Sequence, residues 1–84
     1  MRFMITLGFA VADDDRATVA ALVPKELAHL AALTERGVVE GFYLSADRAR
    51  GWLVMRGESQ AAVARLLEEF PLYRYMQPSF TPLA

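Results

Sequence analysis

One helix ends and one strand begins within the stretch Phe70-Pro71-Leu72-Tyr73-Arg74-Tyr75-Met76. Proline lacks an amide hydrogen and disfavours helical geometry in the residue before it, so Phe70 should lie in the last turn of a helix. The aromatic residues that follow are typical of a strand. This strand should span residues 76–83. Since Pro78 and Pro82 both lack the amide on the same side of it, we expect it at an edge of a sheet.

The helix that ends at Phe70 should begin just after Ser59. A serine hydroxyl can accept a hydrogen bond from a free amide of the first helical turn, so Ser59 is a suitable N-cap. Val63, Leu67 and Phe70 then fall on one face at the helical period. The pattern therefore predicts an amphipathic helix with its apolar face against a sheet.

Two apolar stretches, residues 38–44 and 51–56, precede this helix and flank the predicted turn Asp47-Arg48-Ala49-Arg50. They are rich in β-branched and aromatic residues, which predicts a hairpin of two strands. Neither stretch alternates cleanly between apolar and polar residues, so both faces of the hairpin should be buried. A wet face would expose apolar surface on the order of several hundred Å2. We therefore expect a second copy of the sheet to cover it.

The first part of the chain predicts a strand followed by a long helix. Apolar residues alternate from Phe3 to Phe9 with the period of a strand. The carboxylates of residues 13–15 favour the start of a helix, and Gly37 is a suitable stop. Pro24 lies between them and removes one helical hydrogen bond, so we expect a kink or a broken first segment.

Two lines of side chains run along this predicted helix. The apolar line is the predicted core face: Val19, Val23, Leu27, Leu30 and Ala31. The line beside it combines two leucines with two ionisable groups: Leu22, Glu26, His29 and Leu33. A face that met only solvent would not contain these leucines, so we expect the second line to be partly covered as well.

The elements follow in the order βαββαβ. Its usual arrangement is the ferredoxin-like α+β fold, a four-stranded antiparallel sheet with both helices on one face. The 84 residues suffice for a single domain, 1–84, whose small core makes association with a second copy a common remedy. Two such sheets packed face to face form a dimeric α+β barrel, and imperfectly filled space in the dimer becomes an apolar pocket for a small organic ligand.

Charge and composition exclude several classes of function. The formal net charge is −1 and no basic cluster occurs, which argues against nucleic acid as a partner. The chain has no cysteine, and one histidine with scattered carboxylates does not supply a metal site, so we predict no metal. No apolar stretch reaches the roughly 20 residues of a membrane-spanning helix, and no signal-peptide pattern is present. We expect a cytoplasmic protein without a membrane partner.

Several segments together resemble the muconolactone Δ-isomerase family over nearly the whole chain: Glu26-Leu27-Ala28, Leu33, Gly37, Leu66-Leu67 and the run from Phe70 to Met76. The most specific of them is the Pro-Leu-aromatic-x-Tyr-Met run between the second helix and the last strand. The resemblance implies a dimeric α+β barrel, present as a homodimer or a higher oligomer of dimers. It also implies proton transfer on a small organic acid or lactone, without a cofactor.

The chain departs from the family pattern at Met4 and Thr6, where members tend to carry histidine and lysine, and at Leu44, where arginine is common. Such cations could hold a substrate carboxylate. One alternative is therefore a non-catalytic dimeric binding or accessory protein. Related barrels also include polyketide cyclases and cofactor-independent monooxygenases, and the fold alone does not choose among them.

Glu26 and His29 are the candidate catalytic residues. His29 is the only histidine, and the ordinary pKa of histidine near neutrality suits a base that removes and returns a proton. Glu26 lies one helical turn earlier, so it could orient the imidazole or serve as the base itself. The alternative, that both are ordinary solvated or interfacial residues, stays open.

The candidate ligand-binding residues are four aromatic side chains and one arginine: Tyr43, Trp52, Tyr73, Tyr75 and Arg48. The aromatic rings suit a flat, partly unsaturated ligand, and their hydroxyl and indole groups can form directional hydrogen bonds. An arginine can bind a carboxylate or stabilise an enolate. Packing or surface exposure would explain each of these residues equally well.

Overall fold

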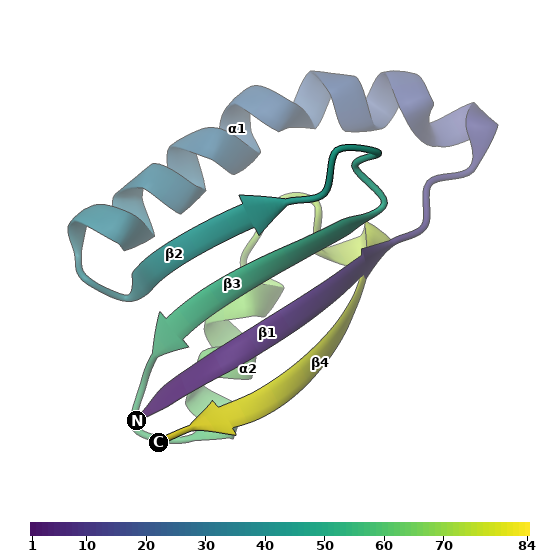
Figure 1. Ribbon diagram of the computed structural model, residues 1–84. Coiled ribbons are helices and arrows are strands. Elements are labelled where there is room, and N and C mark those ends of the chain that lie inside the picture. Colours follow the sequence, from purple (N-terminus) through teal and green to yellow (C-terminus); the bar gives the residue numbers. More distant parts are fainter.

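The computed structural model describes residues 1–84 as four strands and two α-helices in the order β-α-β-β-α-β (Figure 1). The elements are β1 (Arg2–Phe9), α1 (Arg16–Glu35), β2 (Val39–Leu44), β3 (Arg50–Arg56), α2 (Gln60–Glu68) and β4 (Met76–Leu83). Short 3₁₀ turns precede α1 (Asp13–Asp15) and β4 (Tyr73–Tyr75). The predicted ferredoxin-like α+β fold is confirmed.

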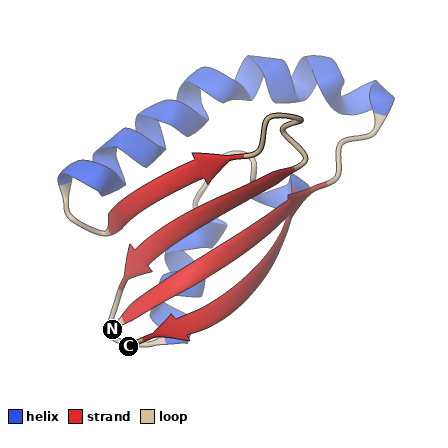
Figure 2. Cartoon of the chain, viewed as in Figure 1, coloured by secondary structure: helices blue, strands red, loops and turns tan.

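The strands form one antiparallel sheet in the order β2-β3-β1-β4. In the centre, Ile5 of β1 lies opposite Leu53 of β3 and Phe80 of β4. β4 is an edge strand, as its two prolines predicted. Figure 2 shows α2 behind the sheet and α1 running along its β2 edge, with no element in front of the strands, so one face of the sheet is free.

Strict alternation along the two central strands builds the core on the covered face. Phe3, Ile5 and Leu7 of β1 are at most 1% exposed. β3 adds Leu53 and Met55, which are equally buried. The helices close this layer with the following side chains: Leu33 from α1, Val63 and Leu67 from α2, and Phe70 after it.

Helix α2 begins just after Ser59 as predicted, but it ends at Glu68, so Phe70 lies beyond the last turn in which it was expected. The Ser59 hydroxyl accepts a hydrogen bond from the Ala62 amide at 3.1 Å, which caps the first turn. The predicted contact face is buried at Val63, Leu67 and Phe70. The helix itself ends at Glu68, before the Phe70-Pro71 junction.

Helix α1 runs from Arg16 to Glu35 without a break at Pro24, so the expected broken first segment is wrong, although the helix bends along its length in Figure 1. It ends in the left-handed conformation of Gly37, at φ 76°. Directly beyond, the Val38 amide donates to the Leu33 carbonyl at 2.9 Å, which ties this end of the helix to β2. No helix of the protein meets the length and apolarity that crossing a membrane requires.

The predicted core face of α1 is only partly right, since Leu30 packs against the core but most of the predicted line does not. In the apolar line, Leu27 is 55% and Val23 is 39% exposed, and Ala31 is also exposed. The neighbouring line lies further inward, because Leu33 is buried and Glu26 is only partly exposed. The helix contacts β2 near its C-terminal end, and only that end packs fully against the core.

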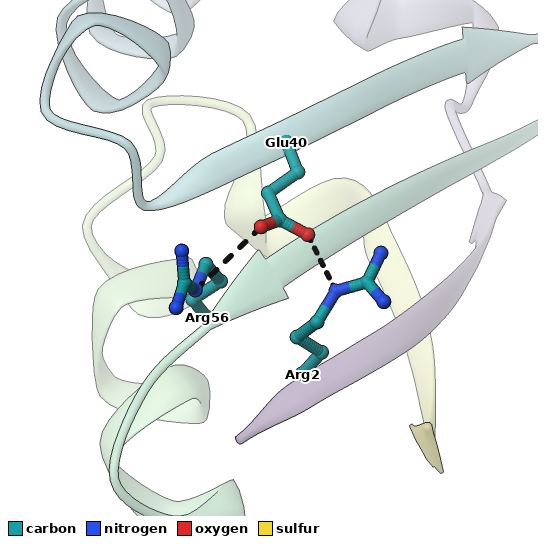
Figure 3. A network of polar contacts seen from close by, with 3 residues as sticks. All are labelled: Arg2, Glu40 and Arg56. Carbon is teal, nitrogen blue, oxygen red and sulfur yellow. Dashed lines mark hydrogen bonds and ion pairs between the residues drawn. The ribbon is translucent and has the colours of Figure 1, made fainter. Parts of the chain in front are cut away.

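The free face of the sheet carries both apolar side chains and an ion-pair network. Glu40 is the extra residue of a β-bulge in β2, since Val39 and Gly41 pair with successive residues of β3. Its carboxylate accepts from Arg2 Nε at 2.6 Å and lies 3.5 Å from Arg56 Nε (Figure 3). The network therefore joins β1, β2 and β3 at one end of this face.

Candidate functional site

A cavity of about 850 Å3 lies between α1 and the covered face of the sheet. Hydrophobic residues make up 15 of the 19 that line it. Leu7 and Leu53 of the central strands form part of its wall, and Leu27 of α1 lies across from them. The cavity lies within a single chain, and the pocket that the sequence predicted in a dimer stays a prediction.

The rim of the cavity explains why several large apolar side chains of this protein are exposed. Val23 and Leu27 line it from α1, and Phe42 and Leu44 line it from β2. The exposed fractions of these four side chains lie between 39% and 55%. Their exposure is therefore gathered on one concave surface, where an apolar ligand would cover it.

Charged side chains are few in this cavity: Arg16, Glu26, Asp47 and Arg48. Arg16 forms an ion pair with Asp13 at 3.1 Å in which both side chains are well exposed. No three histidine or carboxylate side chains lie together in a way that could hold a metal ion. The polar chemistry of the site therefore rests on single groups placed in apolar surroundings.

Glu26 is the carboxylate of the cavity that contacts the rest of the fold. Its Oε1 accepts a hydrogen bond from the Leu72 amide at 3.0 Å, which links α1 to the connection between α2 and β4. Burial raises the pKa of Glu26, and it outweighs the Leu72 hydrogen bond and the charge of His29, which both lower it. A carboxyl with a raised pKa holds and releases a proton closer to neutral pH than an exposed one does.

His29 lies beside Glu26 but not on the cavity surface. Its ring meets the Phe70 ring edge to face, with centroids 4.6 Å apart and planes at 89°. Its Nε2 is buried and has no hydrogen-bond partner. The imidazole is therefore packed between α1 and the end of α2. It lies close enough to Glu26 for its charge to lower the pKa of that carboxyl.

Tyr75 lines the cavity at the junction before β4. The residue is 5% exposed, and its hydroxyl is buried without a hydrogen-bond partner. The Arg74 guanidinium lies 5.2 Å from the centre of its ring, and the Ala10 amide donates to its carbonyl at 2.9 Å. A buried hydroxyl without a partner is costly, and protein atoms cover this one, so it does not reach the open surface of the cavity.

Arg48 lies on the cavity in the β2–β3 turn, in the left-handed conformation at φ 62°. The turn is held by Asp47, whose Oδ1 accepts from the Ser45 hydroxyl at 2.7 Å and from the Ala49 amide at 2.9 Å. These two hydrogen bonds hold the pKa of the Asp47 carboxyl below its usual value. Arg48 itself takes part in none of the ion pairs of the protein.

Three of the predicted site residues thus meet at the cavity: Glu26, Arg48 and Tyr75. Tyr43 and Trp52 lie opposite each other on β2 and β3, with side chains on the free face of the sheet. Tyr73 packs against the core without lining the cavity.

The sequence analysis missed Arg16 and the rim residues Phe42 and Leu44 as parts of the site. The rim residues did stand out in the sequence as apolar residues, in the apolar line of α1 and in the consecutive apolar residues of β2. It was interpreted as core and dimer packing, because periodicity does not distinguish a side chain that fills a core from one that borders a cavity.

Two comparisons with known proteins, with family models and with solved structures, fit this architecture. The family model described as muconolactone delta-isomerase matches residues 1–84. The crystal structure of muconolactone isomerase at 3.3 Å resolution superimposes with a TM-score of 0.84 at 22% sequence identity, over 100% of this chain and 88% of that one. This similarity shows a shared fold. No curated protein matches the chain.

The raised pKa of Glu26 predicts a pH-dependent difference in stability between the wild type and Glu26→Gln, which keeps the acceptor for the Leu72 amide. The protonated carboxyl contributes to the free energy of unfolding. This contribution is fully present below 4.5, the pKa of the carboxyl in the unfolded chain, and it is lost as the pH rises through the pKa in the folded protein. Urea unfolding should therefore show that Glu26→Gln gains stability relative to wild type between pH 4 and pH 7. Glu35→Gln, at an exposed position of α1, is the control. If the free energy of unfolding of Glu26→Gln differed from that of wild type by the same amount at pH 4 and at pH 7, the burial of the Glu26 carboxyl would be contradicted.

The left-handed conformation of Arg48 predicts that Arg48→Gly stabilises the fold. A non-glycine residue in this region costs roughly 1 kcal/mol, and part of that gain is offset by the greater entropy of glycine in the unfolded chain. We expect an increase of about 0.5 kcal/mol in the free energy of unfolding by urea titration. Arg50→Gly, in the neighbouring strand, should instead destabilise the protein. A loss of stability in Arg48→Gly would show that the arginine side chain itself supports the turn.

Proposed function

The chain belongs to the muconolactone delta-isomerase family, and on that premise we propose that it is a small isomerase that moves a proton on an unsaturated lactone or a related organic acid without a cofactor. The observation that carries this proposal is the Glu26 carboxyl, whose pKa burial raises, in a cavity with mostly apolar walls. An apolar cavity excludes water and strengthens the electrostatic effect of the few polar groups within it.

In the proposed reaction, Glu26 acts first as the base and then as the acid. The carboxylate takes a proton from a carbon next to the substrate carbonyl, and the electrons of the broken C–H bond move onto the carbonyl oxygen. The protonated carboxyl then returns the proton to another carbon of the conjugated system, which restores the carbonyl. One group can carry both steps because its raised pKa brings the two protonation states closer in free energy at neutral pH than they are in an exposed carboxyl.

The hydrogen bond of Glu26 supports this role. The Leu72 amide holds Oε1 at 3.0 Å, which fixes the carboxyl relative to the segment before β4. Oε2 makes no hydrogen bond within the chain and is free to exchange a proton with a ligand. A base held in one orientation loses less entropy when the substrate binds.

Tyr75 is the proposed donor to the enolate oxygen. Its hydroxyl lacks a partner within the chain, and the residue lines the same cavity as Glu26. Protein atoms cover this hydroxyl, so the side chain would have to turn toward the cavity before it could donate to an enolate and stabilise the charge that develops in the transition state.

His29 is proposed as a positioning residue for Glu26. It packs on Phe70 and does not line the cavity, but its charge lowers the pKa of Glu26. Arg48 is proposed to bind the substrate carboxylate, because it is a cation without an ion-pair partner at the cavity. It would supply a positive charge to the cavity, where the family pattern places one at Leu44, whereas Met4 and Thr6 lie on the free face of the sheet.

A homodimer is part of the proposal. The free face of the sheet presents Met4 beside Val54 and Tyr43 beside Trp52, each pair on neighbouring strands. The side chain of Tyr43 is 64% exposed. A second copy packed on this face would cover these apolar groups, and the Arg2–Glu40–Arg56 network would lie at the margin of the contact.

Glu26→Gln should lower the rate of isomerisation about 100-fold or more, because removal of a general base typically costs that much. The measurement is proton NMR of muconolactone in deuterated buffer, which follows both isomerisation and exchange of the acidic proton. Glu35→Gln is the matched control and should retain the wild-type rate. If Glu26→Gln turned the substrate over as fast as wild type, Glu26 would not be the base. A wild type that binds the lactone without turnover would favour the non-catalytic binding protein.

Val54→Arg should convert the dimer to a monomer. Val54 lies opposite Met4 in the middle of the free face, so an arginine there would place a charge in the contact. Sedimentation velocity at micromolar concentration measures the change, with Arg65→Glu on the exposed side of α2 as the control. A wild type that sediments only as single chains would contradict the proposed dimer.

A further inference from the structure

The cavity is large for a compact lactone. Pockets of about 300–1,000 Å3 typically hold drug-sized ligands, and a cavity of about 850 Å3 lies in the upper part of that range. A single small ring with one carboxylate would leave much of this volume to water against apolar walls. A ligand that left the apolar walls in contact with water would gain little of the free energy of binding that burial of those walls can provide.

The unfilled part of the cavity is its apolar rim. Leu27 of α1 is 55% exposed, and Phe42 and Leu44 of β2 are 39% and 40% exposed. All three side chains line the same cavity as Glu26. A ligand that filled the cavity would cover all three side chains, whereas a single ring is too small to fill it.

The charges of the cavity favour an anionic group on such a ligand. Asp47 is engaged by the Ser45 hydroxyl and the Ala49 amide within the turn. Arg16 is paired with Asp13. Arg48 has no ion pair, and it follows the rim strand β2 directly along the chain. The cavity therefore combines one unpaired cation with long apolar walls.

We infer that this cavity binds carboxylic acids whose apolar body, an extended chain or a fused ring system, is much larger than a lactone ring, with the carboxylate at Arg48 and the body between α1 and the sheet. The inference names the substrate class of the proposed active site and in that respect rests on the proposed function. Its binding part can be tested without any turnover.

The test is isothermal titration of the wild-type protein with a series of straight-chain alkanoates from hexanoate to dodecanoate, below their micellar concentrations. Since each buried methylene contributes about 0.8 kcal/mol, we expect the Kd to fall about fourfold per added methylene until the cavity is full. Arg48→Gln should raise the Kd of every acid about tenfold and leave the dependence on chain length unchanged. Arg65→Gln, remote on α2, should have no effect.

Leu27→Trp tests where the chain lies. The larger side chain would fill the rim, so the gain in affinity should stop at a shorter chain while hexanoate binds as before. A Kd that is the same for hexanoate and dodecanoate, or no binding of any alkanoate, would overturn the inference. A third outcome would also overturn the inference. If wild type bound no alkanoate and the Leu27→Arg substitution lowered the sedimentation coefficient, the rim would be a contact between copies of the chain.

Failure of the inference can be distinguished from failure of the proposed function. Glu26→Gln keeps the hydrogen bond to Leu72 and the shape of the cavity, so it should bind alkanoates with the wild-type dependence on chain length. Alkanoate binding with no effect of Glu26→Gln on turnover would remove only the proposed base. Lactone isomerisation that depends on Glu26, without any binding of the longer acids, would remove only the larger substrate.

Discussion

One hydrogen bond, from the Leu72 amide to Glu26 Oε1, joins helix α1 to the segment between α2 and β4, and the candidate site depends on it. Helix α2 ends at Glu68 and Pro71 follows, so the Leu72 amide lies outside any regular element. Glu26 satisfies the amide from a helix 46 residues away in the sequence. The contact draws a carboxylate off the surface of α1 and into the cavity, and the resulting burial is what raises its pKa.

The two faces of the sheet have different roles because strand residues alternate between them. On the covered face, side chains such as Ile5 and Leu53 build the core, and the same face continues into the cavity at Leu44. On the free face, Tyr43 and Trp52 lie on neighbouring strands, away from that cavity. A strand with apolar side chains on both faces can thus contact a ligand on one face and another protein surface on the other.

Three departures from ordinary protein structure gather around this one cavity. Glu26 has a carboxyl with a raised pKa, Tyr75 has a buried hydroxyl without a partner, and Arg48 has a left-handed backbone conformation. Each costs stability when the cavity has no ligand. Their convergence on a single apolar cavity is typical of a functional site, where stability is commonly sacrificed for binding or chemistry.

The sequence by itself determined the order of the elements, the start of α2, the end of α1 and the edge position of β4, because alternation, capping residues and prolines act locally at Phe3–Phe9, Ser59, Gly37 and Pro78. It also marked Glu26, Arg48 and Tyr75 as candidates by their chemistry. Only the tertiary structure decided which apolar line of α1 faces the core and which borders a cavity. That choice depends on how the helix is tied to β2 and to Leu72, contacts between segments far apart in the chain that no local periodicity encodes.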